Sequence, residues 1–596
     1  MILRTLVLVA VLGIVVHSRS IQRDQNWWNH ATFYQIYPRS FKDSNNDGDG
    51  DLPGIIEKLP YLVETGVNGI WLSPIMESPQ VDQGYDISNY YVIDPRFGTL
   101  DDLKLLIIKA HELGLKVILD FVPNHTSDQH EWFKASENRT EGYEDYYVWR
   151  DGTSDKPPNN WLSLWTGSAW QWSEKRQQYY LHQFSKQQPD LNYRNPKVHK
   201  EMKDILKFYM DLGIDGFRID AIPYAYEDDQ FRDEPRSASP VDPNDYSYLE
   251  HNYTSNLPET YALVYEWRKF VDDYAAENDL DSKVLMTEAN ADLNQTMLYY
   301  GTSDGKNLGA HFTFNFLMIQ NLNLNTSNAY DIIQMIYSWI DALPDIYSSN
   351  WVVCILYVGM KQRQHKQSLI MSSLFQIGNH DNRRYPTRYG AENKDGFLML
   401  DLLLPGVAVT YNGEEFGQED GEVKYEEGQD PTARDPAVFE QKSRDFERTP
   451  LQWDNTTNAG FNEGAKTWLP VSKKYQELNL KSQLDETKES YFQNYKALIR
   501  KRQEETARLG STNIWALSND ALVLRRSYEG KHIAVAFKLG WKDNNEQETV
   551  LIPGVSCQNG NVAIASVGSQ YKRGDNISLQ SLVLQPHEAV VIDIEC

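Results

Sequence analysis

The chain has 596 residues, of which 41% are hydrophobic, and this is enough to build a large core. It carries 84 acidic against 58 basic residues, a balance that argues against nucleic acid and anionic membranes as partners. We expect most of this negative charge to lie on a solvated surface.

Residues 1–20 have the pattern of a secretory signal peptide. Arg4 precedes an apolar stretch over residues 6–16, which is too short to span a bilayer, and small residues follow near Ser18 and Ser20. The C-terminal sequence has no hydrophobic tail behind a polar spacer, so no GPI anchor is expected. We therefore expect a secreted, soluble protein without a membrane span.

Seven N-x-S/T sequons agree with passage through a secretory pathway. One of them, Asn124, adjoins a strand end that is expected to belong to the functional site, so we expect it to remain unmodified. The six sequons expected to carry glycans are Asn138, Asn252, Asn294, Asn325, Asn455 and Asn576.

The loop DSNNDGDGD, residues 43–51, alternates oxygen-bearing side chains in the manner of a calcium loop. Gly48 stands at the sixth position as in an EF-hand, but the twelfth position is Gly54 rather than the bidentate Glu that an EF-hand requires. The loop is therefore not an EF-hand. The alternative interpretation of these residues is an Asx-rich turn without a metal.

Two amphipathic segments predict helices that each lead directly into a strand. Thr99 and Asp102 have the spacing of a capping box at the start of the first, which runs into KVILDFVPNH. Asn195 is the expected N-cap of the second and Pro196 its first helical residue, and GFRID follows. Such alternation of helix and strand predicts parallel strands joined by helical crossovers.

Eight strand-like runs continue this pattern, which is the number needed for a (β/α)8 barrel of the α/β class. The alternative, a doubly wound open sheet, would hold its ligand at one switch point and would not collect acids from strands scattered along the chain. The predicted strands are residues 34–37, 69–73, 117–123, 217–220, 284–288, 309–316, 375–381 and 407–412.

Three of these strands carry a carboxylate at or near the end: Asp220 in GFRID, Glu288 in LMTEA and Asp381 in IGNHD. Glycosidic bond hydrolysis needs one carboxylate at the anomeric carbon and one carboxylic acid that protonates the leaving oxygen, so these acids indicate a glycosidase. Arg218, on the same strand face as Asp220, can hold Asp220 ionised. Glu288 would have to stay protonated near neutral pH, so we expect a less polar pocket around it.

From about Trp27 to the C-terminus, the chain resembles glycoside hydrolase family 13, the α-amylase superfamily, and within it the oligo-1,6-glucosidase and maltase branch, most closely the insect maltases. The resemblance depends on several motifs in a fixed order, no one of which would be specific alone. They are DFVPNH (120–125), QPDLN (188–192), GFRIDA (216–221), MTEA (286–289), NHD (379–381), YNGEE (411–415) and RTPLQWD (448–454).

The resemblance implies that Asp220 is the nucleophile, Glu288 the general acid and base, and Asp381 the carboxylate that stabilises the transition state. It implies a secreted, exo-acting α-glucosidase (maltase) of a digestive lumen or saliva, which releases α-glucose from maltose, sucrose and short α-1,4-oligosaccharides by a retaining double displacement. The substrate-binding residues that it implies are Tyr85, Asp86, His125, Arg218, Ala221, His380 and Arg448.

Ala221, directly after the implied nucleophile, bears on linkage preference. In the branch that this chain resembles, the residue at this place tends to be Val in α-1,6-specific enzymes and smaller or more polar in α-1,4-specific ones, so we expect maltose to be preferred over isomaltose. The alternative function is that of a catalytically silent relative, such as the transporter heavy chains that share this fold, but the intact acids and the absence of a membrane span favour an enzyme.

The same resemblance implies a structural Ca²⁺ in the loop 43–51. Its ligands would be the side chains of Asp43, Asn45, Asp47 and Asp51 and the backbone carbonyl of Asp49.

The expected organisation is a signal peptide at 1–20, a catalytic barrel at 21–126 and 193–508, an inserted domain B at 127–192 and a C-terminal antiparallel β domain at 509–596. Residues 130–172 hold six tryptophans, which we expect mainly to pack domain B, with few touching substrate. From about Asn519 the hydrophobic pattern has a period of two, and a disulfide between Cys557 and Cys596 is plausible in an oxidising compartment. Cys354 has no partner.

Residues 353–376 interrupt the resemblance, because family members run from NWV directly into IGNHD. The segment begins with Val and ends with Gln, whose codons can supply the bases that begin and end an intron, so we hypothesise a retained intron. The rival interpretation is a true insertion, although a long segment abutting a barrel strand would strain the barrel. Sequencing the transcript across residues 351–379 decides the matter, since an abundant messenger that encodes the segment contradicts the intron hypothesis.

Overall fold

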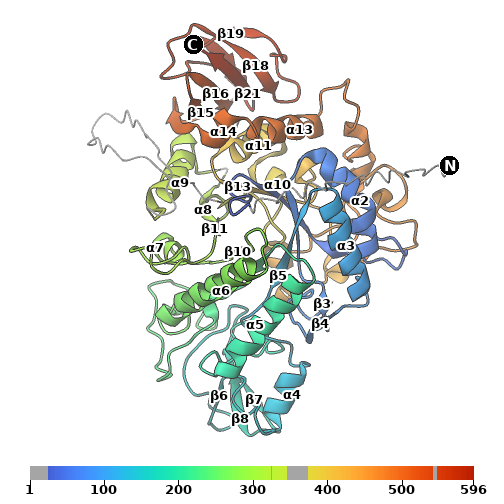
Figure 1. Cartoon of the computed structure of the whole chain (residues 1–596), viewed down its shortest axis with the longest axis vertical. Helices are drawn as coiled ribbons and strands as arrows, with labels where there is room; N and C mark the ends of the chain where they lie inside the picture. The colour runs from blue at the N-terminus through green and yellow to red at the C-terminus, as the bar shows by residue number, and fades with distance from the viewer. Residues whose placement is uncertain (1–23, 324, 345–373, 541–545) are drawn as a thin grey trace, which may run out of the picture.

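The computed structural model describes residues 24–323, 325–344, 374–540 and 546–596, and at its centre parallel strands close into a barrel (Figure 1). The strands follow one another round the ring in chain order, and the last, β13, pairs with the first, β1. The predicted (β/α)8 barrel is therefore confirmed, and every predicted strand overlaps an observed one. In the described part of the chain the barrel strands are β1 (Thr32–Ile36), β2 (Gly69–Leu72), β5 (Lys116–Phe121), β9 (Gly216–Ile219), β10 (Val284–Thr287), β11 (Phe312–Asn315), β12 (Leu374–Phe375) and β13 (Val407–Tyr411).

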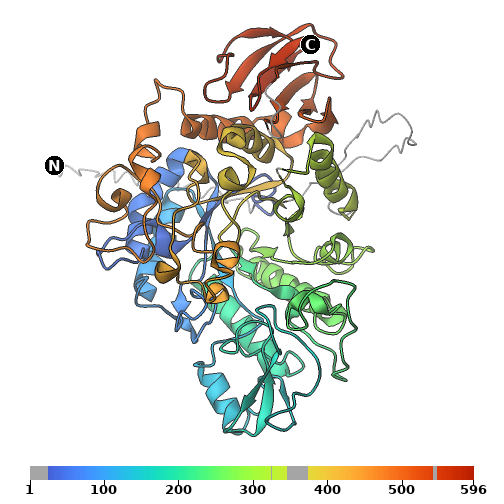
Figure 2. The same ribbon diagram turned by 180° about the vertical axis from the view of Figure 1, so that it is seen from behind.

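Helices pack around the outside of the barrel, as the views from both sides show (Figures 1 and 2). Helix α3 (Leu100–Glu112) begins with the predicted capping box between Thr99 and Asp102, and helix α5 (Pro196–Asp211) begins with Asn195 as its N-cap. Each such cap is worth about 1 kcal/mol of helix stability. Other helices around the barrel are α2 (Leu52–Thr65), α6 (Pro258–Glu277), α9 (Ala329–Ala342), α11 (Lys394–Leu403) and α13 (Tyr491–Arg502).

A small domain lies between β5 and α5 along the chain, at the lower end of the molecule in Figure 1. It contains helix α4 (Glu131–Glu137) and an antiparallel sheet with the strand order β6, β8, β7. This is the inserted domain B of the sequence analysis. Its strands are β6 (Trp149–Arg150), β7 (Trp170–Ser173) and β8 (Gln178–Leu181).

The C-terminal residues form a separate antiparallel β domain at the opposite end of the molecule (Figure 1). A disulfide joins Cys557 to Cys596 with a Cα–Cα distance of 5.4 Å, as the sequence suggested, and ties the last residue to the sheet. The six-stranded sheet consists of β14 (Ser511–Ala516), β15 (Ala521–Tyr528), β16 (Lys531–Lys538), β18 (Asn559–Ala565), β19 (Asn576–Ser578) and β21 (Ala589–Glu595), and β17 (Glu548–Val550) pairs with β20 (Leu582–Leu584).

The last residues of the hypothesised insertion belong to the barrel. In β12, Leu374 pairs with Phe314 of β11 and with Val407 of β13, so β12 completes the ring. Residues 353–373 and the expected signal peptide 1–20 lie outside the described residues. Excision of 353–376 would join Val352 to Ile377 and bring Trp351 and Val352 into the sequence positions next to Ile377. The chain therefore has residues directly before Ile377 that could supply this strand whether or not residues 353–376 are present.

Several buried carboxyl groups form no ion pair with any of the described residues. Burial raises the pKa of Asp190 in domain B, and of Glu414 and Glu447 in the region after β13, to about 8 in each case. Burial also lowers the pKa of histidines such as His125 and His182 to about 4. The folded protein thus holds more protons on these carboxyl groups, and fewer on these histidines, than the unfolded chain.

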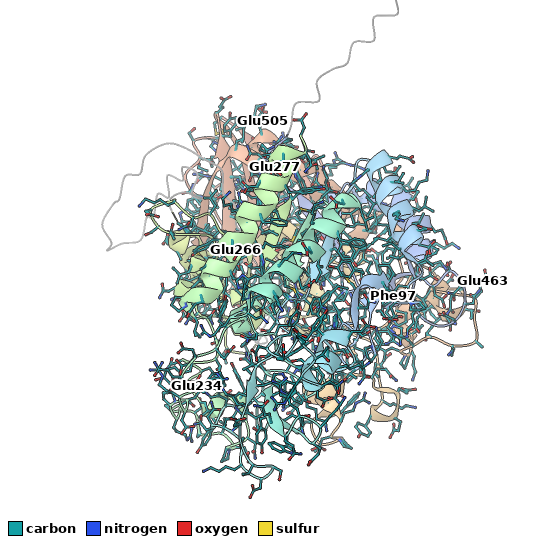
Figure 3. All side chains as sticks on the ribbon, turned by 60° about the horizontal axis from the view of Figure 1, so that its bottom comes forward. Phe97, Glu234, Glu266, Glu277, Glu463 and Glu505 are labelled. Carbon is teal, nitrogen blue, oxygen red and sulfur yellow. A yellow bond between two sulfur atoms is a disulfide. The ribbon has the colours of Figure 1, made fainter. Side chains whose placement is uncertain are left out.

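These shifts predict a stability that declines above neutral pH. A carboxyl group whose folded pKa is raised contributes stability that is present below its unfolded pKa of about 4.3 and is lost as the pH rises to the folded value. The buried histidines oppose this loss only up to about pH 6.5, their unfolded pKa. Between about pH 6.5 and 8 the carboxyl groups act alone, and the melting temperature should fall. In Glu414→Gln this fall should be shallower, whereas the exposed control Glu463→Gln (Figure 3) should follow the wild type; equal slopes in all three proteins would contradict the prediction.

Candidate active site

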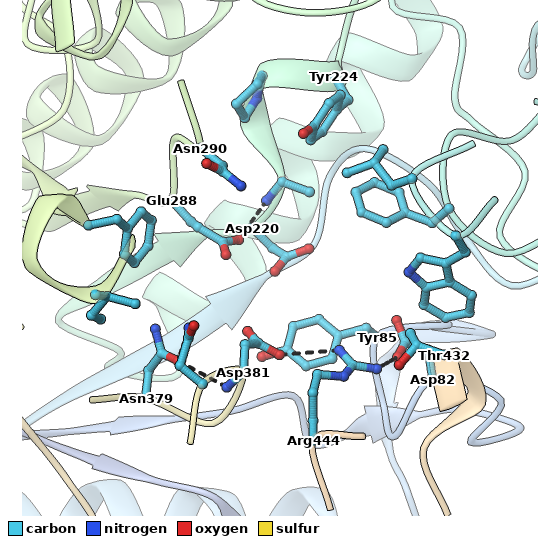
Figure 4. Close-up of a pocket in the computed structure, with 18 of the residues that line it drawn as sticks. Asp82, Tyr85, Asp220, Tyr224, Glu288, Asn290, Asn379, Asp381, Thr432 and Arg444 are labelled. Atoms are coloured by element: carbon cyan, nitrogen blue, oxygen red, sulfur yellow. Dashed lines mark hydrogen bonds and ion pairs between the residues drawn. The ribbon is translucent and has the colours of Figure 1, made fainter. Parts of the chain in front are cut away.

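The three predicted carboxylates meet in one cavity at the C-terminal ends of the barrel strands (Figure 4). Asp220 directly follows β9, Glu288 directly follows β10, and Asp381 lies in the loop after β12. All three line the cavity, which has a volume of about 460 Å³. The parallel barrel brings them together because the C-terminal ends of its strands share one rim.

The Arg218 side chain is the centre of the acidic group. Its guanidinium lies 2.5 Å from Asp220, 2.9 Å from Glu288 and 3.3 Å from Asp120. Burial raises the pKa of Asp220, the neighbouring Glu288, Asp120 and Asp381 add to that rise, and Arg218 acts against it. The predicted contact between Arg218 and Asp220 is confirmed, and Arg218 is the group that opposes the rise in the pKa of Asp220.

The expectation of a less polar pocket around Glu288 is wrong. One Glu288 oxygen accepts a hydrogen bond from the Ala221 backbone N–H at 3.1 Å and pairs with Arg218. A single guanidinium faces three carboxyl groups here, and the neighbouring carboxyl groups add to the rise in the pKa of Asp220.

Asp381 has the opposite surroundings. Arg448 lies 2.7 Å from it, Arg444 3.2 Å and His380 3.3 Å. Burial alone would raise the pKa of Asp381, but His380, Arg448 and Arg444 together hold it below its usual range. Burial also lowers the pKa of His380 to about 3, so the two arginines provide the positive charge at neutral pH.

Two charged residues that line the cavity, Asp82 and Arg444, were not predicted. Asp82 and Arg444 form an ion pair at 3.0 Å (Figure 4), and Arg444 is also held by Asp430 at 2.8 Å. Four of the predicted substrate-binding residues are not among those that line the cavity, namely Asp86, Arg218, His380 and Arg448. The sequence signal was present, because Asp82 is in the same VDQGYD stretch as Asp86, and Arg444 is four residues before Arg448.

Asp86 and Arg448 instead support the cavity wall. The Asp86 carboxylate accepts hydrogen bonds from the backbone N–H groups of Val81 and Asp82, which fixes the turn that presents Asp82. Arg448 donates to the His380 carbonyl at 2.6 Å as well as to Asp381.

Tyr85, His125 and Ala221 line the cavity as predicted. The Tyr85 hydroxyl lies 2.9 Å from Asp120 and 2.6 Å from a ring nitrogen of His380, and the two rings are stacked. Ala221 has a left-handed backbone with φ of 47°, which is uncommon for a residue other than glycine. That conformation directs its N–H toward Glu288.

Among the six tryptophans of residues 130–172, Trp165 lines the cavity and the other five do not. Trp161 and Trp170 belong to the small core of domain B, and Trp149 packs into the main core. The packing role predicted for most of these residues is confirmed.

In the loop 43–51, successive side chains accept hydrogen bonds from backbone N–H groups two residues further on. Asp43 accepts from Asn45, Asn45 from Asp47, and Asp47 from Asp49, at 2.9 to 3.1 Å. The Asp49 side chain is instead paired with Arg39. Across the described residues, no three or more His, Cys, Asp or Glu side chains are gathered as a ready metal cluster.

Comparison with known proteins assigns the chain to a family. The alpha amylase catalytic domain matches residues 35–510. The chain is 46% identical over 579 residues to Maltase 1 of Drosophila virilis, covering 96% of this chain and 87% of that protein. It is 41% identical over 581 residues to the salivary alpha-glucosidase of Anopheles gambiae, covering 95% of this chain and 93% of that protein.

A solved structure agrees over most of the chain. The alpha-glucosyl transfer enzyme XgtA has a TM-score of 0.79 and 33% sequence identity to this chain, and the match covers 95% of this chain and 99% of that one. The chain belongs to the α-amylase family of glycoside hydrolases, glycoside hydrolase family 13.

Proposed function

We propose that this protein is a secreted, exo-acting α-glucosidase that releases glucose from maltose, sucrose and short α-1,4-oligosaccharides. The observation that carries the proposal is the convergence of Asp220, Glu288 and Asp381 on one cavity of a family 13 barrel. The Asp82–Arg444 pair in the cavity wall supports exo action, because charged groups there suit the hydroxyls of a terminal sugar. The names of the insect relatives support the choice of maltose-type substrates.

The chemistry that we propose is a double displacement with retention. The Asp220 carboxylate attacks the anomeric carbon while the proton of Glu288 passes to the leaving oxygen, and the glycosidic bond breaks. Glu288 then takes a proton from water, the water oxygen attacks the same carbon, and the ester to Asp220 breaks. Asp381, held ionised by Arg444 and Arg448, stabilises the positive charge that develops on the sugar.

Asp220→Asn should lower the hydrolysis of p-nitrophenyl α-glucoside by several orders of magnitude and leave the fold intact, because it removes the nucleophile without changing the shape of the side chain. Asp304→Asn, at an exposed position, is the matched control and should retain full activity. The first-formed sugar seen by NMR should be α-glucose. Release of β-glucose would contradict retention. A wild-type protein that does not hydrolyse p-nitrophenyl α-glucoside would favour the catalytically silent alternative.

Maltose should be hydrolysed with a higher kcat/KM than isomaltose, because the small Ala221 side chain leaves room on the leaving-group side. A size difference of this kind is worth about 1–3 kcal/mol. Ala221→Val should shift the ratio toward isomaltose. Since the backbone of Ala221 is left-handed and disfavours a β-branched residue, the control is Ala221→Gly, which relieves the backbone without adding bulk. If Gly shifts the ratio as much as Val does, side-chain size does not set the preference.

We also propose that the protein is secreted and carries N-glycans. Each of the six sequon asparagines is exposed, whereas Asn124 is only 1% exposed. Salivary relatives support an extracellular location, and no helix among the described residues is long and apolar enough to cross a membrane. A mass decrease of protein from culture medium after enzymatic removal of N-glycans tests both points.

We also propose that the loop 43–51 binds a structural Ca²⁺. Asp43 and Asp51 are both buried, neither is ion-paired within the described residues, and burial raises the pKa of Asp51. A cation would relieve this, with the side chains of Asp43, Asn45, Asp47 and Asp51 and the Asp49 carbonyl as ligands. Chelation should lower the melting temperature, and Ca²⁺ should restore it. Asp47→Ala should abolish this response, and a chelator without effect on the wild type would contradict the site.

A further inference from the structure

Domain B does not complete its small core by itself. The cluster formed by Val148, Trp161, Ala169, Trp170, Tyr179 and Leu181 is covered in part by Phe231 and Tyr253, which lie outside domain B in the chain. Both belong to the segment between β9 and α6, residues 220–257, here called the β9–α6 loop. This loop begins at Asp220, so the element that carries the implied nucleophile also covers the core of domain B.

Phe231 makes the apolar contact. Its ring stacks on Trp161 with centroids 5.4 Å apart and lies 6.1 Å from Trp170, and the Arg150 guanidinium sits 3.3 Å above it. The backbone of Phe231 is left-handed, with φ of 53°. A phenylalanine holds such a conformation only where its surroundings fix it. These contacts therefore hold the loop in a defined position against domain B.

Asn160 makes the polar contact. Its side-chain amide donates to the Glu234 carbonyl at 2.9 Å and accepts from the Glu234 N–H at 2.8 Å, so it binds the loop backbone in both directions. Its own N–H donates to Asp233 at 3.0 Å. Nearby, the Trp161 indole donates to the Arg232 carbonyl at 2.9 Å. Figure 3 shows Glu234 at the end of the molecule away from Glu505, which belongs to the helix before the C-terminal domain.

The joined elements form one wall of the cavity. Leu164, Trp165 and Phe184 come from domain B, and Tyr224 comes from the β9–α6 loop. Phe184 and Tyr224 meet edge to face at 5.4 Å, and Gln183 donates to the Tyr224 carbonyl at 2.9 Å. Tyr224 lies on the far side of Asp220 from Arg444 (Figure 4). The Asp82–Arg444 pair is proposed to bind the terminal glucose, so we place the leaving sugar on the opposite side of Asp220, against this wall.

We propose that Phe231 and Asn160 are positioning residues that join domain B to the β9–α6 loop and thereby fix the leaving-group side of the cavity. The proposal rests on the α-glucosidase function proposed above. The glucose-binding side depends on ion pairs from other elements, namely Asp82 with Arg444 and Asp381 with Arg448. Loosening the joint should therefore weaken binding of the second sugar and spare the first.

The test compares maltose with glucose in Asn160→Asp and Phe231→Ala. Asn160→Asp replaces the N–H donor to the Glu234 carbonyl with an oxygen, which repels that carbonyl. Phe231→Ala removes the ring that stacks on Trp161. Each should raise KM for maltose about tenfold, the effect of losing one or two hydrogen bonds or an equivalent contact. The kcat and the Ki of glucose as a competitive inhibitor should change by less than about twofold. Phe231→Tyr should have the wild-type KM for maltose, since it retains the stacked ring.

Controls separate this effect from general destabilisation. Gln129→Glu adds the same charge at an exposed site in domain B and should behave as the wild type. Hydrogen exchange of residues 159–170 should rise in Asn160→Asp and Phe231→Ala but not in the control. Unchanged KM for maltose, or equal weakening of maltose and glucose, would overturn the proposal. A wild type that does not hydrolyse maltose would instead refute the proposed function, so the two failures are distinguishable.

Discussion

The arrangement of this active site depends on one buried guanidinium. Arg218 is on β9, which lies between β5 and β10 in the barrel, and it pairs in register with Asp120 on one side and Met286 on the other. A side chain from the middle strand can therefore reach acids on all three strands. Removing one member of a buried ion pair costs about 3–5 kcal/mol, so the acids and the arginine constrain one another. The positions of Asp220 and Glu288 follow from this constraint.

The carboxyl groups of the cavity differ in pKa because each faces a different number of acidic and basic side chains. Near Arg218 three acids share one cation, and the neighbouring acids add to the rise in the pKa of Asp220 that burial causes. Around Asp381 two arginines face one carboxylate, which favours full ionisation. The two clusters thus give the carboxyl groups of one cavity different pKa shifts, according to the number of positive groups that each carboxyl group faces.

The sequence was sufficient for the barrel and for the three acids, because hydrophobic runs that end in Asp or Glu encode both the strand and its functional end. It was not sufficient to choose between Asp82 and Asp86, or between Arg444 and Arg448. Asp82 and Asp86 lie in one short stretch, where the turn fixed by Asp86 decides which of them faces the cavity. Arg444 lies four residues before Arg448 and outside the RTPLQWD motif. The charge around Glu288 was missed for a related reason, since Arg218 was assigned to Asp220 alone. The contact of Phe231 with domain B joins segments far apart in sequence, and no local pattern predicts it.

The two sides of the cavity are built by different interactions, and this has a consequence for specificity. The side that we propose binds glucose is held by charged groups that stabilise one another, so a change at any of them disturbs the others. The side that we propose faces the leaving group is formed by side chains such as Tyr224 and Trp165, next to the contact between domain B and the β9–α6 loop. A substitution in a packing contact usually costs less stability than the loss of one member of a buried ion pair. Preference among leaving groups can therefore vary within this fold while recognition of the terminal glucose stays fixed.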